Sequence, residues 1–184
     1  MSYWNYGGVW VQVIQVLKNP LTDRYKKFKD LCLSDSISWN YLKNSTSERI
    51  PGHVDMPFYS HNLLGRPEVF GYSAKLSPHF ELAKDVIIEI IKYNNIDGIK
   101  FLLRTCVNCV HPTFEVKKSQ PHKDHTFNHK NFIIYFTNSG GKTFVEKEYH
   151  DPKEDDVLLF DGTHYMETPK RDRRIILIAT LYEE

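Results

Sequence analysis

A cluster of metal-binding side chains lies in the stretch QPHKDHTFNH, residues 120–129. His122 and Asp124 are two residues apart, so in an extended segment both side chains lie on one face and can bind one metal ion. The third ligand need not be local, and His164, in FDGTHYMETP, follows a short apolar strand and a turn. Two histidines and one carboxylate, with other positions left open, form the ligand set of non-haem iron(II) sites. The pattern therefore predicts an iron site, and the alternative is that the three are solvated turn residues.

A pair of arginines follows His164 at the start of the last apolar segment. Arg174 lies ten positions after His164, and Arg173 directly precedes it. A planar guanidinium holds a carboxylate at two points, so one of them could anchor a dicarboxylate co-substrate that also binds the metal. Because side chains alternate along a strand, only one of the two points into a pocket. We favour Arg174 and keep Arg173 as the alternative. Arg174 shares its face with residues that suit a pocket wall: Ile176, Ile178, Thr180 and Tyr182.

Four segments in this order resemble the 2-oxoglutarate and iron(II)-dependent dioxygenases of the prolyl-4-hydroxylase-like kind. They are PHKDH, IIYFTNSGGKTFVE, DDVLLFDGTHYMETP and RRIILIATLY, between residues 104 and 182. Upstream, FYSHNLLGRP (58–67) resembles small phage-encoded members. The resemblance implies a double-stranded β-helix, which is a jelly-roll or cupin-like core, with iron(II) bound at its open end.

The resemblance also implies roles for individual residues. The three predicted ligands would bind the iron, and Arg174 would anchor the distal carboxylate of 2-oxoglutarate, with Arg173 as the alternative. Tyr135 resembles the tyrosine that many members use to contact this co-substrate, and Phe136 is the alternative in that position. The implied cofactors are Fe(II), 2-oxoglutarate as co-substrate, and O2.

The implied activity is that of an Fe(II)- and 2-oxoglutarate-dependent oxygenase. It would hydroxylate a C–H bond of a peptidyl or small-molecule substrate and release succinate and CO2. Two alternatives stay open: a catalytically silent jelly-roll binding protein and a dioxygenase directed at nucleic acid. The net charge of +1, from 24 basic and 23 acidic residues, makes nucleic acid an unexpected partner. The short run KRDRR, 170–174, is interpreted as a solvated turn, and the oligomeric state is left open.

Composition bounds the fold class. A length of 184 residues with 41% hydrophobic content predicts one globular α+β domain over 1–184. A helical and loop-rich flank, 1–98, would precede a jelly-roll metal-binding core, 99–184, with the helices packed on one sheet. No apolar run approaches the roughly 20 residues of a membrane span, so no membrane partner is expected. Three cysteines and the absence of a signal-peptide pattern favour a cytoplasmic location.

Hydrophobic periodicity predicts the individual elements. The clearest helix covers 77–95, where apolar residues recur every three or four positions, and a second helix covers 21–33. A β-branched run predicts a strand over 9–16. The stretch 34–73 is rich in Ser, Asn, Gly and Pro, which is typical of a long loop, and we expect it to form part of the substrate entrance. Residues 58–67 are expected among its mobile pieces, and short strands follow from residue 99 onward.

Other polar residues near the predicted site have less specific interpretations. His125 and His129 are four apart, but the residues between them are weak helix formers, so we expect rim residues rather than a zinc pair. His125 is also expected to touch substrate. Cys106 and Cys109 form a C-x-x-C with no partner motif and are interpreted as buried strand cysteines. Arg104 on the same strand either lines the pocket or pairs with a surface acid.

Overall fold

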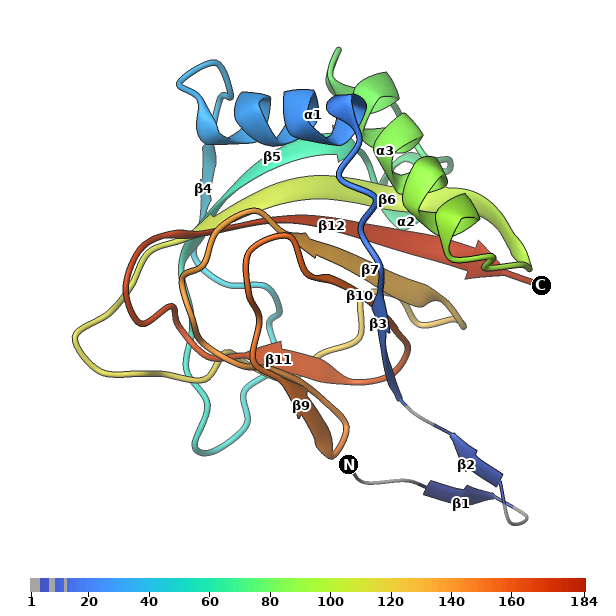
Figure 1. Cartoon of the computed structure of the whole chain (residues 1–184). Coiled ribbons are helices and arrows are strands. Elements are labelled where there is room, and N and C mark those ends of the chain that lie inside the picture. The colour runs from blue at the N-terminus through green and yellow to red at the C-terminus, as the bar shows by residue number, and fades with distance from the viewer. Residues whose placement is uncertain (1–3, 7–8, 12) are drawn as a thin grey trace.

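Two antiparallel sheets that face each other form the centre of the protein (Figure 1). The computed structural model describes residues 4–6, 9–11 and 13–184. Within these residues, a large sheet has the strand order β3-β10-β7-β12-β6-β5-β4, and a small sheet has the order β11-β8-β9. The large sheet consists of β3 (Ile14–Leu17), β10 (Val157–Phe160), β7 (Lys130–Tyr135), β12 (Arg174–Glu183), β6 (Ile99–Val110), β5 (Phe58–Leu64) and β4 (Asn40–Leu42). The small sheet consists of β11 (His164–Met166), β8 (Thr143–Val145) and β9 (Glu148–His150).

The strand order brings together segments that are distant in the sequence. Strands that are distant in sequence are neighbours, since β12 pairs with both β6 and β7, and β10 pairs with both β7 and β3. Such crossed antiparallel pairing in two facing sheets is the arrangement of a jelly roll. The expected α+β class with a double-stranded β-helix core is confirmed.

The N-terminal segment differs in detail from the prediction. β1 (Trp4–Tyr6) pairs antiparallel with β2 (Val9–Val11), and β3 begins at Ile14. The single strand predicted over 9–16 is therefore two strands, and residue 12 between them lies outside the described residues. Only β3 joins the large sheet, where it forms one edge next to β10.

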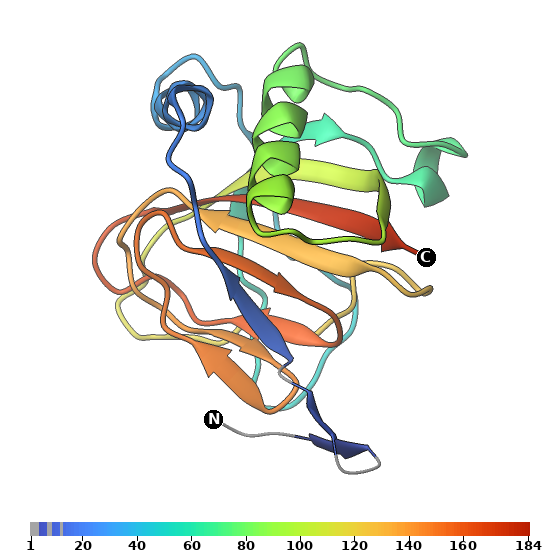
Figure 2. The same ribbon diagram turned by 45° about the vertical axis from the view of Figure 1, so that its right-hand side comes forward.

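Two helices cover the outer face of the large sheet, as expected. Figure 2 shows α1 (Asp23–Leu33) and α3 (Phe80–Tyr93) on the side of this sheet that faces away from the small sheet. Thr22 caps α1 by accepting a hydrogen bond from the backbone N–H of Tyr25 at 3.2 Å. In the described part of the chain, no helix has the length and apolar character that crossing a membrane requires. The predicted apolar stripe of α3 is buried: Phe80, Ala83, Val86, Ile87, Ile90 and Ile91.

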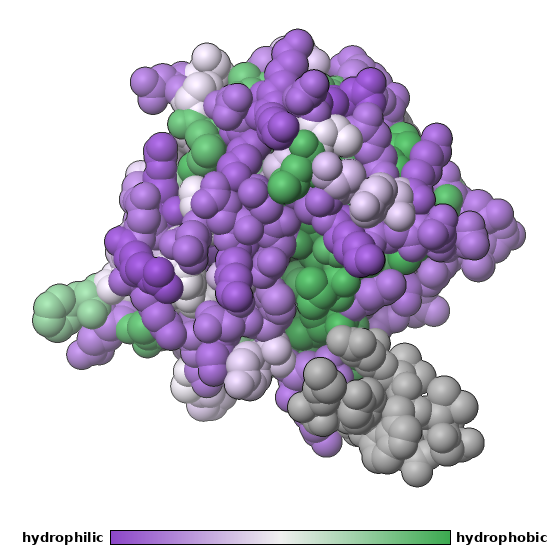
Figure 3. All heavy atoms as spheres, in the orientation of Figure 1, coloured by the Kyte–Doolittle hydropathy of each residue, from purple (hydrophilic) through white to green (hydrophobic). Residues whose placement is uncertain are grey.

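Alternating side chains of the large sheet build two separate cores. On the helix side, Ile134 and Phe136 pack with the buried faces of α1 and α3. On the inner side, Ile133 and Tyr135 pack with residues of β10 and β12. The face of the molecule in Figure 3 is mainly hydrophilic, with its largest hydrophobic area near the centre of the view and smaller ones elsewhere. The inner core is the one that reaches the predicted site.

Part of the stretch 34–73, predicted as a loop, forms regular structure instead. Residues 58–64 form β5, which pairs with β6 and β4 inside the large sheet, and a short helix, α2 (Pro67–Phe70), follows. The buried polar residues of β5 interrupt its apolar pattern, and His61 has its own partners: Ser38 O and Ser77 Oγ lie 2.9 Å from its ring nitrogens. The flank thus supplies strands to the sheet as well as helices.

The helix layer provides a stability prediction with a neighbouring control. Ile87 is fully buried beneath α3, whereas Ile88 is 37% exposed. Ile87→Ala should lower the free energy of unfolding by about 2–5 kcal/mol, because it removes buried methyl groups and leaves a cavity. Ile88→Ala should change it by roughly 0.5 kcal/mol, as surface substitutions do. Chemical denaturation of both variants measures this, and equal losses would contradict the assigned helix face.

Candidate metal centre

The three predicted ligands lie together between the two sheets. One ligand atom from each of His122, Asp124 and His164 falls within 4.8 Å of the others. Asp124 and His164 are buried, at 8% and 4% exposure, and His122 is half-buried. His122 and His164 also exchange two backbone hydrogen bonds, each 3.0 Å long, so their main chains are paired. The geometry is that of a compact two-histidine, one-carboxylate cluster.

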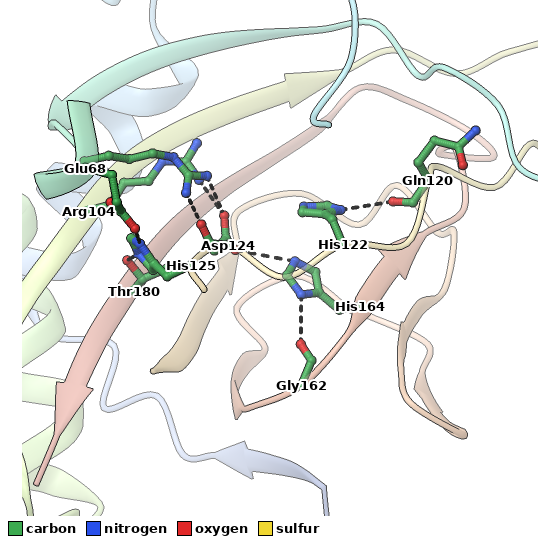
Figure 4. A network of polar contacts seen from close by, with 10 residues as sticks. Glu68, Arg104, Gln120, His122, Asp124, His125, Gly162, His164 and Thr180 are labelled. Carbon is green, nitrogen blue, oxygen red and sulfur yellow. Dashed lines mark hydrogen bonds and ion pairs between the residues drawn. The ribbon is translucent and has the colours of Figure 1, made fainter. Parts of the chain in front are cut away.

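The hydrogen bonds of the two imidazole rings involve Nδ1 and leave Nε2 available to a metal. Nδ1 of His122 donates to the carbonyl of Gln120 at 3.0 Å, and Nδ1 of His164 lies 3.5 Å from the carbonyl of Gly162 (Figure 4). A histidine whose Nδ1–H is bonded to a carbonyl keeps a lone pair on Nε2 for a metal. Burial lowers the pKa of His164 to about 4, against the opposing effect of Asp124, so the ring is neutral near pH 7. A neutral imidazole is the form that binds metal.

Two arginines hold Asp124 in place. Its Oδ1 accepts hydrogen bonds from Nη1 of Arg104 and from Nη2 of Arg66, both at 2.8 Å, while its backbone carbonyl accepts from Nη1 of Arg66. Oδ2 faces the other side, 3.6 Å from Nε2 of His164. Burial alone would raise the pKa of the carboxyl, but the charge of Arg104, with smaller effects from the two histidines and Arg66, lowers it. The carboxylate is therefore ionised, with one oxygen turned toward the histidines.

A pocket of about 320 Å³ opens onto this cluster. All three candidate ligands line it, together with both arginines that contact Asp124. Arg104 was expected either to line the pocket or to pair with a surface acid; it lines the pocket, and its acid partner is the buried Asp124. Residues from the stretch 34–73 line the same pocket, among them Leu42, Met56, Phe58 and Arg66. Ile176 and Ile178 of β12 complete one wall.

Arg174 and Arg173 have opposite environments. Arg174 is fully buried on the face of β12 that also carries Ile176, whereas Arg173 is exposed. Nη1 of Arg174 donates to the carbonyl of Gly141 at 3.3 Å, and its Nε and Nη2 have no hydrogen-bond partner in the described protein. Burial lowers the pKa of this guanidinium, but an arginine stays charged in proteins. Two unpaired donors on a buried cation are what an anion-binding side chain presents.

Gly141 is itself constrained by this arrangement. Its φ is +87°, in the left-handed region, and a Cβ there would lie 2.5 Å from the carbonyl oxygen of Thr168. Only glycine accommodates both conditions without a shift of the backbone. The turn NSGG therefore brings a backbone carbonyl close to Arg174.

Tyr135, rather than Phe136, faces the interior between the sheets. Its hydroxyl lies 2.6 Å from Oγ1 of Thr143, and burial raises its pKa to about 12 despite the nearby charge of Arg174. Phe136 points to the other face of the sheet and packs against Tyr25 and Phe28 of α1. The phenol and the guanidinium thus lie on the same side of the large sheet.

The prediction that His125 and His129 are rim residues is wrong. His125 is 4% exposed and His129 is 7% exposed. Nδ1 of His125 contacts the carboxylate of Glu68 in α2, and its Nε2 lies 2.8 Å from Oγ1 of Thr180 in β12. His125 therefore joins α2 to the sheet, and it is not among the residues that line the pocket at the metal centre (Figure 4). The expected absence of a helix in this segment agrees with the structure.

Cys106 and Cys109 are buried strand residues, as interpreted from the sequence. Both are free thiols in β6, at 0% and 4% exposure. Three residues apart, they face opposite sides of the strand, and Cys109 belongs to the helix-side core. Burial raises the pKa of each thiol, which keeps it protonated and unreactive.

Comparison with known proteins places this geometry in context. No protein-family model matches the sequence, and no curated protein matches it. Solved structures do match. A 2OG-Fe(II) oxygenase family oxidoreductase from Burkholderia pseudomallei aligns with a TM-score of 0.61 and 11% identity, over 88% of this chain and 78% of that one. The chain has the fold of the 2-oxoglutarate and iron(II)-dependent oxygenases.

Two prolyl hydroxylases share this oxygenase fold. One, from Trichoplax adhaerens in complex with a hypoxia inducible factor peptide fragment, has a TM-score of 0.58 and 11% identity, over 93% of this chain and 84% of that one. The other, a Pseudomonas putida prolyl-4-hydroxylase, has a TM-score of 0.56 and 11% identity, over 94% and 93% of the two chains. The similarity to prolyl-4-hydroxylase-like oxygenases, inferred from about half the sequence, extends to most of the fold.

Sequence reasoning missed two residues of this oxygenase-like site. Arg66 contacts Asp124, and Glu68 contacts His125, although both precede those partners by 50 residues or more. The segment FYSHNLLGRP contains Arg66, but only its similarity to other sequences drew attention to it. Neither residue forms a local pattern with its partner, so no spacing could have identified the contact.

Proposed function

We propose that this protein is an Fe(II)- and 2-oxoglutarate-dependent oxygenase. It hydroxylates a C–H bond of a peptidyl or small-molecule substrate and releases succinate and CO2. The observation that carries this proposal is the buried cluster of His122, Asp124 and His164 in a fold shared with such oxygenases. A fold alone does not establish an activity, so the proposal depends on the chemistry of the residues themselves.

The donor set suits iron(II). Two imidazole nitrogens and one carboxylate oxygen are offered from one side, which leaves room for exogenous ligands on the other. Nδ1 of His122 is hydrogen-bonded to a backbone carbonyl and Oδ1 of Asp124 to two arginines, so the ligand atoms are oriented before any metal arrives. His122, Asp124 and His164 are therefore the residues that would hold the metal.

Arg174 suits the distal carboxylate of 2-oxoglutarate. Its guanidinium is fully buried and has two nitrogens without protein partners, which the oxygens of a bound carboxylate can satisfy. The Tyr135 hydroxyl and the Thr143 hydroxyl lie on the same side of the sheet and can add neutral hydrogen bonds. Arg173 is exposed and lacks these features, which supports Arg174 as the anchor.

The residues of the chain would bind the metal, orient its ligand atoms and shield the reacting atoms from water. Bound iron(II), with 2-oxoglutarate as the reductant, supplies the activation of O2 that inserts oxygen into the C–H bond. The paired histidines hold their nitrogens at a fixed separation, and the two arginines direct Oδ2 of Asp124 toward them. Ile176 and Ile178 give the pocket an apolar wall that restricts water near the reacting atoms. The Trichoplax prolyl hydroxylase was solved with a peptide, which supports a peptide as one substrate class.

Titration of the purified protein tests this proposal. Under anaerobic conditions we expect one iron(II) to bind per chain, and 2-oxoglutarate to bind the iron-loaded form more tightly than the metal-free form. On admission of O2, the loaded protein should convert 2-oxoglutarate to succinate, because uncoupled turnover needs no specific substrate. Calorimetry measures binding, and quantification of succinate measures turnover. If 2-oxoglutarate binds the iron-loaded and the metal-free forms with equal affinity, the result would instead favour a catalytically silent jelly-roll protein.

A further inference from the structure

The pocket beside the candidate metal centre has more positive than negative side chains. Among the residues that line it, the charged ones are Arg66, Arg104 and Asp124, which is two cations and one anion. Glu68, which follows Arg66 by two residues, is engaged with His125 and does not line the pocket. A pocket wall with an excess guanidinium attracts anions and disfavours cations.

The hydrogen bonds to Asp124 do not use all the donors of the two arginines. Arg66 already donates two hydrogen bonds to this residue, one to its carbonyl and one to Oδ1. Arg104 donates to the same Oδ1 from Nη1 alone, and the structure gives its other nitrogens no partner in the described chain. Arg104 lines the pocket, and these nitrogens are not fully enclosed by protein. Arg104 therefore presents free donors to a ligand beside the metal ligands.

A second polar group in the pocket also lacks a protein partner. Asn108 is 8% exposed and lines the pocket; its Oδ1 is enclosed by protein, whereas its Nδ2 is not enclosed and has no hydrogen-bond partner among the described residues. Asn108 pairs with Ile176 across the strands, so its amide lies next to the apolar wall formed by Ile176 and Ile178. Buried amides are normally hydrogen-bonded, so an unpaired one that faces a pocket marks a contact for a ligand.

We propose that the substrate is a small carboxylic acid with an apolar body, and that Arg104 and Arg66 bind its carboxylate. This inference rests on the proposed oxygenase function and names its substrate class. A guanidinium matches a carboxylate in geometry, and the remaining pocket residues include Met56, Phe58 and Val110, which suit an aliphatic or aromatic body. A volume of about 320 Å³ is near the lower end for ligand pockets and fits an amino-acid-sized molecule. The Asn108 amide suits a substrate that carries a polar group near its carboxylate.

Matched pairs of acids and amides test this assignment. The probes are the N-acetyl derivatives of valine, leucine, proline and phenylalanine, each as the free acid and as the carboxamide. Binding to the protein loaded anaerobically with iron(II) and 2-oxoglutarate is measured by calorimetry, which does not depend on turnover. We expect at least one acid to bind, and its carboxamide to bind at least about tenfold more weakly, because the amide lacks the charge that the arginines recognise.

Substitution of the arginines shows whether they cause the discrimination. Arg104→Met and Arg66→Met should each bring acid and amide to within about threefold of each other. Arg173→Met is the control, because this exposed arginine is remote from the pocket lining, and it should leave the discrimination intact. Iron and 2-oxoglutarate titrations of every variant check that the site is loaded, and Arg104→Lys should restore part of the preference for the acid.

The other possible outcomes distinguish a failure of this inference from a failure of the oxygenase proposal. Equal binding of acids and amides, or no binding by any of the eight probes, overturns the inference while the oxygenase proposal stands if iron and 2-oxoglutarate still bind. Discrimination that survives in both methionine variants also overturns it, as does an Arg104→Met variant that loses 2-oxoglutarate affinity instead. Binding of a peptide blocked at both ends, without binding of the acids, would point to a peptide substrate. Failure of the parent protein to bind iron removes the oxygenase proposal and the inference together.

Discussion

His164→Ala should abolish tight iron(II) binding and 2-oxoglutarate turnover while the protein stays folded. His164 is 4% exposed and supplies one of the three clustered ligand atoms. Losing only a hydrogen-bond partner of a metal ligand costs about 10–100-fold in affinity, so losing a ligand itself should cost more. The backbone hydrogen bonds between His164 and His122 do not involve the side chain and should persist. Calorimetric titration with iron(II) and thermal unfolding of the same sample measure both effects.

A histidine outside the cluster provides the control for this substitution. His111 is exposed and lies in the loop that follows β6, so His111→Ala should bind iron(II) as the parent does. Asp124→Ala and His122→Ala should behave like His164→Ala, because each removes one of the three ligands. If the His164→Ala protein binds iron with the affinity of the parent, the proposed ligand set is wrong.

Arg174→Ala should weaken 2-oxoglutarate binding far more than Arg173→Ala. Removing one partner from a buried, hydrogen-bonded charge pair costs about 2–5 kcal/mol, which at its midpoint is several hundredfold in affinity. Arg174 is fully buried with two unpaired guanidinium nitrogens, whereas Arg173 is exposed, and its substitution should cost roughly 0.5 kcal/mol or less. Titration of the iron-loaded variants with 2-oxoglutarate gives the two affinities.

Iron(II) binding by Arg174→Ala and Arg173→Ala shows whether a loss of 2-oxoglutarate affinity is independent of a loss of metal. We expect both arginine variants to bind iron(II) normally, because neither residue contacts the candidate ligands. A large loss in Arg173→Ala with a small one in Arg174→Ala would move the anchor by one residue and leave the oxygenase proposal intact. Unchanged 2-oxoglutarate affinity in both variants would remove the co-substrate from the proposal.

The parts of the fold that the sequence predicted are those with a strong local pattern. The apolar stripe of α3 repeats at helical spacing, and strand alternation in β12 separates Arg174 from Arg173. β5 escaped prediction because Ser60 and His61 are buried polar residues in mid-strand. Their burial depends on partners elsewhere in the chain, so the strand lacks the alternation of apolar and polar residues by which strands are detected.

At the site, too, features set by nearby residues could be predicted from the sequence, and contacts with residues distant in the sequence could not. The spacing of His122 and Asp124 indicated a pair of ligands, and the resemblance to iron(II)-dependent oxygenases was needed to assign His164 as the third. His125 was expected at the rim because it is polar and lies in a polar segment, yet Glu68 and Thr180 satisfy both ring nitrogens in the interior. Contacts of this kind depend on the folded topology, since the partners lie 57 and 55 residues away.

The backbone pairing of His122 with His164 has a consequence for how such a protein can change over evolution. The separation of these two ligands is set by main-chain hydrogen bonds, which do not depend on the identity of neighbouring side chains. Pocket residues on other elements, such as Leu42, Met56 and Phe58, can therefore be exchanged without displacing the histidines. Substrate preference and metal geometry are thus separable traits, and directed evolution at these three positions should yield new specificities that retain the iron site.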